Sequence, residues 1–86
     1  MRAVHTPRYK EMLRRLRTAR HHAELTQVDV AEALGRTQAF VSKCELGERR
    51  IDPLDLYDFA KLYGKELDYF VAGLGSAKVG RGRTGV

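Results

Sequence analysis

The amino-acid sequence predicts an all-α fold, a compact bundle of five short helices, and three observations support this prediction. Apolar residues recur at spacings of three and four along most of the chain, as they do on the buried face of a helix. Gly35, Gly47 and Gly64 follow three of these apolar segments, at positions where helices commonly end. No segment alternates between apolar and polar residues in the manner of a half-buried strand.

The first helix is expected over residues 9–23, soon after Pro7. Its spacing of three and four places one apolar stripe along the helix, which should face the core. The stripe consists of Tyr9, Met12, Leu13, Leu16, Ala19 and Ala23.

The second and third helices are expected to be short and nearly adjacent. Thr26 is a good N-cap for a second helix, which should end at Gly35. Thr37 repeats the capping signal for a third helix over residues 38–46, and Gly47 should end that helix in a left-handed conformation. About three residues therefore join the two helices.

The fourth helix should begin near Pro53, which suits a first helical turn, and continue to Gly64. Leu67, Phe70 and Val71 indicate a brief fifth helix. The expected organisation is a flexible amino end over residues 1–8, one folded domain over residues 9–72 and a flexible, basic, glycine-rich tail over residues 73–86.

The charge of the chain favours a polyanionic partner. The 86 residues carry a formal net charge of +5, and the pI is about 9.7. Positive charge is in excess over residues 1–20 and 36–50, whereas negative charge is in excess over residues 21–35 and 51–77. The folded domain could therefore present one basic and one acidic face, although charge alone does not distinguish nucleic acid from a membrane surface.

A cytoplasmic location is expected. Cys44 is the only cysteine, so no intramolecular disulfide can form. No signal-like or long apolar segment is present, so neither export nor a membrane span is expected.

The third helix carries the side chains of most chemical interest. At about 100° per residue, Val41 and Cys44 fall on one side of it. The opposite side offers groups that hydrogen-bond to base edges in the major groove of DNA, glutamine to adenine and lysine to guanine, with apolar atoms for the thymine methyl. The simpler alternative is an ordinary solvated face. The residues on that side are Gln38, Ala39, Ser42, Lys43 and Leu46.

From about Leu13 to Phe70 the sequence resembles the phage-repressor-like helix-turn-helix family, of the XRE or Cro type. The spacing of two glycines, two capping residues and four core positions carries the resemblance. The matching residues are Leu25-Thr26-Gln27, Val30-Ala31, Leu34-Gly35, Thr37-Gln38, Val41-Ser42-Lys43, Glu45 and Gly47, followed by Ala60, Gly64 and Leu67.

The resemblance implies a sequence-specific DNA-binding transcriptional regulator, expected to be a repressor, with double-stranded DNA as its partner. It also implies a bacterial or phage protein that is associated with the nucleoid. It implies a buried, structural ion pair between Arg20 and Glu45. The implied base contacts are Gln38, Ala39, Ser42 and Lys43, and the implied phosphate contacts are Gln27, Arg36, Thr37, Arg49 and Arg50.

Three positions depart from the family pattern. Arg36 replaces an apolar turn residue, so either it reaches a phosphate or the turn packs differently. Leu46 stands where a basic or polar residue is more usual, and Lys65 replaces an aliphatic residue before the fifth helix. Phe40 lies at the border of core and groove by the angle count, and core packing is favoured.

No enzyme, cofactor, metal site or small-molecule ligand is expected. Cys44 lies on the apolar side of its helix, where a buried small hydrophobe is the better interpretation than a nucleophile or ligand. His21 and His22 are adjacent and point to different helix faces, and His5 lies in the amino end. The acidic residues around the fourth helix are read as a solvated surface.

The active species is expected to be a homodimer. One small domain offers few base contacts, and two copies on a pseudo-palindromic site double them. The expected interface comprises Leu67, Tyr69, Phe70 and Val71, since one short helix cannot bury four bulky residues against its own core. The alternative function is a protein-interaction module of the same fold, such as an antitoxin.

Overall fold

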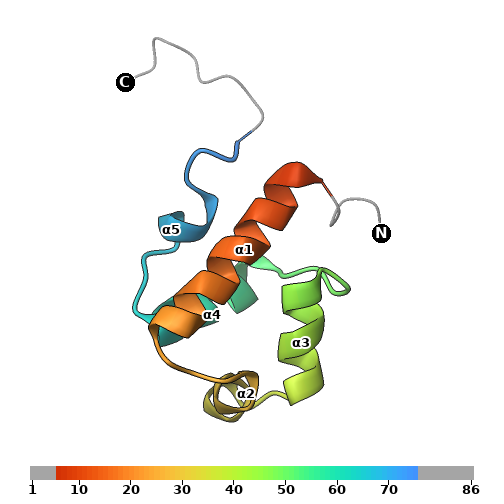
Figure 1. The fold of residues 1–86 in the computed structure, drawn as a ribbon, viewed down its shortest axis with the longest axis vertical. Helices are drawn as coiled ribbons and strands as arrows, with labels where there is room; N and C mark the ends of the chain where they lie inside the picture. Colours follow the sequence, from red (N-terminus) through yellow and green to blue (C-terminus); the bar gives the residue numbers. More distant parts are fainter. Residues whose placement is uncertain (1–5, 76–86) are drawn as a thin grey trace.

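A computed structural model describes residues 6–75, and within them the chain forms five α-helices and no strand (Figure 1). The all-α fold and the order of the helices are therefore confirmed. The helices are α1 (Pro7–His22), α2 (Gln27–Leu34), α3 (Gln38–Leu46), α4 (Pro53–Tyr63) and α5 (Asp68–Val71). Most of the expected amino end, residues 1–5, and most of the expected tail, residues 76–86, lie outside the described residues.

Short polar side chains fix where the helices begin. The Thr26 hydroxyl accepts from the Asp29 backbone N–H at 3.0 Å, while the Thr26 N–H donates to the Asp29 carboxylate at 2.9 Å. This reciprocal capping box holds the pKa of Asp29 below its usual value, because the carboxylate accepts from the backbone N–H and lies beside the Thr26 hydroxyl. At the start of α3 the Thr37 hydroxyl accepts from the Phe40 N–H, and at the start of α4 the Asp52 carboxylate accepts from the Asp55 N–H, a single capping bond in each case.

Helix α1 begins at Pro7, two residues earlier than expected. The Thr6 hydroxyl accepts from the Tyr9 N–H at 3.2 Å, and Pro7 fills a first-turn position that needs no N–H partner. At the other end of the domain, the Arg8 guanidinium donates to the carbonyl oxygen of Leu74 at 3.2 Å, so the chain just after α5 lies against the start of α1.

Two glycines end the helices that flank the tight turn. Gly35 has a φ of 68° and Gly47 a φ of 80°, in the left-handed region where a side chain would be strained. The turn from α2 to α3 is short because Gly35 ends α2 and Thr37 already caps α3.

The core lies between α1 and the other helices. Leu16, Val41 and Phe59 have no exposed surface, and the rings of Phe40 and Phe59 stack with centroids 6.3 Å apart. Cys44 is equally buried, as expected for a small hydrophobe, and burial raises the pKa of its thiol to about 11.

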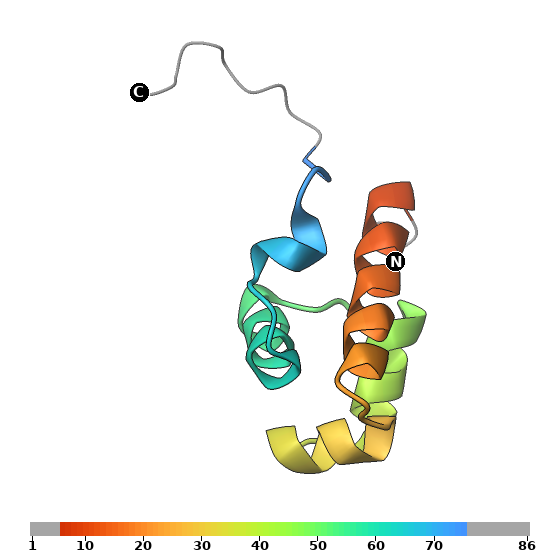
Figure 2. The ribbon, with the colours of Figure 1, turned by 60° about the vertical axis from the view of Figure 1, so that its left-hand side comes forward.

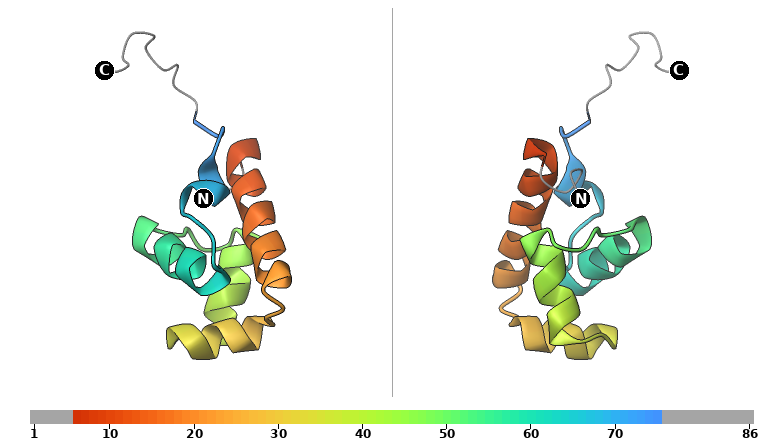
Figure 3. Two further views of the ribbon diagram at one scale, coloured as in Figure 1. Left: turned by 90° about the vertical axis from the view of Figure 1, so that its left-hand side faces the viewer. Right: turned by 90° about the vertical axis from the view of Figure 1, so that its right-hand side faces the viewer.

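The packing of the helices leaves one side of α3 open. Helix α1 contacts α3, α4 and α5, while α2 contacts α3 and α4. Figures 2 and 3 show α1 and α3 side by side, with α2 crossing below their ends. Within residues 6–75, none of the helices combines the length and apolar character needed to cross a lipid bilayer.

Candidate functional site

Helix α3 has one buried and one exposed side, as the angle count predicts. Val41 and Cys44 have no exposed surface, whereas Gln38, Ala39 and Lys43 are exposed. Ser42 is half-buried beside them, and the Leu46 side chain is 65% exposed at the end of the helix. An amide, a hydroxyl, an ammonium group and small apolar groups therefore share one accessible surface.

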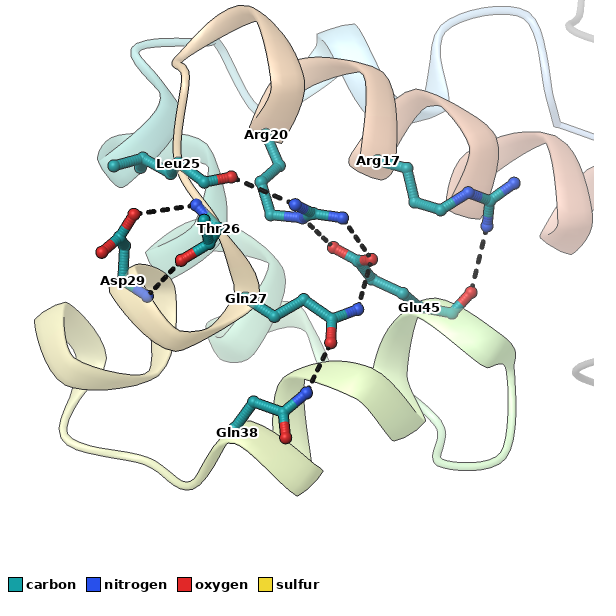
Figure 4. A network of polar contacts seen from close by, with 8 residues as sticks. All are labelled: Arg17, Arg20, Leu25, Thr26, Gln27, Asp29, Gln38 and Glu45. Carbon is teal, nitrogen blue, oxygen red and sulfur yellow. Dashed lines mark hydrogen bonds and ion pairs between the residues drawn. The ribbon is translucent and has the colours of Figure 1, made fainter.

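A buried ion pair fixes α3 against α1. The Arg20 Nε–H donates to Glu45 Oε2 at 2.7 Å, and the Nη2–H donates to Oε1 at 3.0 Å (Figure 4). Arg20 is 9% exposed and Glu45 is 3% exposed. The hydrogen bonds to Glu45 raise the pKa of Arg20, and a further bond from Arg20 reaches the Leu25 carbonyl at 3.1 Å. Both charges are thus paired out of water.

The ion pair continues into a chain of amide contacts that ends on the exposed surface. Gln27 at the start of α2 donates through Nε2 to Glu45 Oε1 at 3.0 Å. Gln38 at the start of α3 donates through Nε2 to Gln27 Oε1 at 2.7 Å. The side-chain oxygen of Gln38 points away from the network in Figure 4. The orientation of the Gln38 amide is therefore tied to a buried charge pair.

Arg17 belongs to the same region, although it was not among the candidate residues. Its Nη1–H donates to the carbonyl oxygen of Glu45 at 3.1 Å, near the carboxyl end of α3, where a positive charge is favourable. The signal that could have identified Arg17 is its position three residues before Arg20, on the same face of α1.

Three further arginines, Arg36, Arg49 and Arg50, lie just before or just after α3 in the chain. The guanidinium carbon of Arg36 lies 3.6 Å from the Phe40 ring centroid, and that of Arg49 lies 4.9 Å from the same centroid. Phe40 is 8% exposed, so the expected core packing of its side chain is confirmed. The guanidinium groups of Arg36 and Arg49 both contact its ring. Arg36 additionally donates to Asp55 Oδ1 at 3.3 Å. Arg50 lies over the Tyr9 ring at 5.9 Å.

The candidate dimer residues do not all lie on the surface. Leu67 is 40% exposed and Val71 is 38% exposed, while Tyr69 is half-buried between Lys65 and Phe70. Phe70 has no exposed surface, because α5 packs on α1 and directs this ring into the core. The Phe70 side chain is therefore core, and a partner could reach only the other three residues.

The site has the chemistry of hydrogen bonding and charge. An exposed amide, hydroxyl and ammonium group can bond to base edges, and the surrounding guanidinium groups can bond to phosphates. Within residues 6–75, no three His, Cys, Asp or Glu side chains gather in a way that could hold a metal ion.

Comparison with known protein families gives a match. A family model described as a helix-turn-helix domain matches residues 11–68, which include the ion pair, the tight turn and all of α3. No curated protein and no solved structure matches the chain significantly.

The buried pair yields a stability prediction. Arg20→Met should lower the free energy of unfolding by about 3–5 kcal/mol, because it leaves the Glu45 carboxylate buried without its partner. Urea denaturation followed by circular dichroism measures this loss.

Arg14→Met is the matched control. Arg14 is also on α1 and pairs with Glu11 at 2.7 Å, but its side chain is 58% exposed. A surface pair of this kind contributes about 0–1 kcal/mol. Equal losses for the two variants would contradict a special role for the buried pair.

Proposed function

Because the chain belongs to the helix-turn-helix domain family, we propose that it is a sequence-specific DNA-binding transcriptional regulator that reads the major groove with α3. The observation that carries the proposal is the exposed side of α3, on which Gln38 is held at a defined orientation by Gln27 and Glu45. On an ordinary solvated helix face, an exposed glutamine is not expected to be hydrogen-bonded to a residue that contacts a buried ion pair. The regulator would act on the DNA of a bacterium or of an infecting phage, in the cytoplasm.

The geometry of Gln38 suits adenine. A glutamine pairs with adenine by accepting from N6 and donating to N7. The Gln38 Nε2 group has two N–H bonds, of which one donates to Gln27. One N–H and the side-chain oxygen remain for the base. Because the amide is already oriented, less conformational entropy is lost on binding.

The other base contacts and the phosphate contacts follow from position along the same surface. Ala39, Ser42 and Lys43 extend the base-reading side of α3 beyond Gln38. We expect the phosphate contacts at the two ends of α3, beside its base-reading side. Such contacts orient the protein on the duplex but carry no sequence information. They are Gln27, Arg36 and Thr37 near the start of α3, and Arg49 and Arg50 just after its end.

A repressor is the simplest regulator of this construction. The described part of the chain is one small domain, and occupying an operator requires only that the domain binds there more tightly than elsewhere. Specific sites are typically bound about 10³–10⁷ times more tightly than other DNA. That ratio is difficult to reach with the few base contacts of one copy.

We therefore propose that a homodimer binds a pseudo-palindromic operator, with the two α3 helices about 34–36 Å apart. Leu67 and Val71 supply exposed apolar surface on and beside α5, and Tyr69 lies between them. Helix α4 adds Leu54, which is 74% exposed, and Tyr57, which is 49% exposed. Exposed apolar side chains on these two helices favour a protein contact there.

Two substitutions distinguish a base contact from a phosphate contact. Gln38→Ala should weaken binding to the preferred duplex by about 1–3 kcal/mol and leave binding to random duplex nearly unchanged. Arg49→Ala should weaken both about equally and reduce the slope of log affinity against log salt by about one unit. Fluorescence anisotropy over a range of salt concentrations measures both effects on a duplex selected from a random pool.

Equal losses on both duplexes for Gln38→Ala would contradict its reading role. If the unsubstituted protein binds every duplex weakly and alike, sequence-specific regulation is wrong, and a protein-interaction module such as an antitoxin becomes the better assignment.

Sedimentation tests the dimer. The free protein should sediment as a dimer at micromolar concentration, and Val71→Glu should produce a monomer by placing a charge in the apolar contact. Val28→Glu, at an exposed valine on α2, should leave the dimer intact. A monomeric unsubstituted protein that binds an isolated half-site at full affinity would refute the dimer.

A further inference from the structure

The turn before α3 contains an ion pair that the base-reading role does not explain. Arg36 Nη1 lies 3.3 Å from Asp55 Oδ1, which joins the turn to the first turn of α4. The Arg36 side chain is 36% exposed and that of Asp55 is 14% exposed. The arginine thus remains accessible from solvent while its partner is largely covered.

One aromatic ring holds two arginines in the same neighbourhood. The guanidinium carbons of Arg36 and Arg49 lie 3.6 Å and 4.9 Å from the Phe40 ring centroid. The separation of the two guanidinium carbons therefore cannot exceed the sum of these distances, which is short enough for the two cations to bind neighbouring phosphates of one strand. Burial raises the pKa of the Cys44 thiol, and the charges nearby also shift it, Arg36 and Arg49 lowering it and Asp55 raising it, so all three charges lie within electrostatic range of that thiol.

The cluster of Arg36, Arg49 and Asp55 lies beside the reading surface. Arg36 immediately precedes Thr37, the N-cap of α3, and Gln38 follows. Arg49 comes two residues after Gly47, the C-cap of the same helix. A duplex whose major groove receives α3 would bring its phosphate backbone to this edge of the helix.

The pair between Arg36 and Asp55 can be exchanged. It is a single contact at 3.3 Å, longer than the about 2.7–2.9 Å of a strong charge-assisted bond, and its arginine is partly exposed. Such pairs contribute little to stability in water. A phosphate offers Arg36 a bidentate, charge-assisted arrangement of greater strength. The Phe40 ring keeps the guanidinium plane in position while the anion changes.

We propose that Asp55 is the counter-ion of Arg36 in the free protein, that a DNA phosphate displaces it, and that Arg36 and Arg49 then form a phosphate clamp on the Phe40 ring. Asp55 competes with every duplex, whatever its sequence. It therefore lowers the overall affinity for DNA without changing which sequence is preferred. This inference rests on the proposed DNA-binding function.

A double-mutant cycle with Asp55→Asn and Arg36→Gln tests the proposal. Arg36→Gln should weaken binding to random duplex about tenfold and lower the salt slope by about one unit. Asp55→Asn should strengthen binding to preferred and random duplexes by about threefold to tenfold, because Arg36 is freed. In the Arg36→Gln background, Asp55→Asn should change affinity by less than about twofold.

Asp58→Asn is the control. Asp58 lies on the same helix, three residues further on, and is exposed without a charged partner among residues 6–75. Asp58→Asn removes the same charge as Asp55→Asn, but it should change the affinity for DNA much less. Thermal melting of each variant establishes that it is folded, and the partly exposed pair predicts little loss of stability.

Results of three kinds would overturn the proposal. An equal gain from Asp55→Asn with and without Arg36, or an equal gain from Asp58→Asn, would mean that only net charge matters. Weaker binding by Asp55→Asn would mean that Asp55 positions Arg36 for DNA. No change would mean that Arg36 does not exchange partners. If the unsubstituted protein binds no duplex even at low salt, the proposed function itself is wrong, which distinguishes that failure from these three.

Discussion

The buried ion pair between Arg20 and Glu45 constrains how α1, α2 and α3 pack against one another. Removing two charges from water is costly, and the cost is offset only where each charge is fully hydrogen-bonded. Glu45 accepts two bonds from Arg20 and one from Gln27. The need to satisfy one buried carboxylate therefore brings together α1, α2 and α3. Hydrogen bonds between fixed atoms constrain the position of α3 more closely than a non-directional apolar contact would.

The same constraint reaches the surface through side chains that would otherwise move freely. Gln27 is anchored by Glu45, and Gln38 is anchored by Gln27, so the orientation of an exposed amide is set by a buried charge. The aromatic rings play a comparable part elsewhere around α3. Phe40 packs on Phe59 in the core and at the same time carries the guanidinium groups of Arg36 and Arg49. In both places the core determines the position of groups suited to DNA.

The sequence predicts the helices well because their ends are local features. Thr26 and Gly35 bound α2, and their roles need only neighbouring backbone groups. The ion pair could be predicted only from the resemblance to a family, since no local sequence pattern relates Arg20 to Glu45. The contacts from Gln38 to Gln27 and from Arg36 to Asp55 depend on how the helices are placed, so the sequence alone did not indicate them. Composition also could not tell which of the bulky residues near α5 enters the core.

We propose that the buried pair of Arg20 and Glu45 orients the exposed side of α3, including Gln38, as well as stabilising the fold. The most direct test replaces the pair by apolar residues, in Arg20→Met combined with Glu45→Leu, which leaves no unpaired buried charge. Binding to the preferred duplex and to random duplex is then compared with that of the unsubstituted protein. We expect a folded protein that keeps its affinity for random duplex but loses at least about tenfold in specificity, a difference of about 1.4 kcal/mol. A folded double variant with undiminished specificity would contradict it.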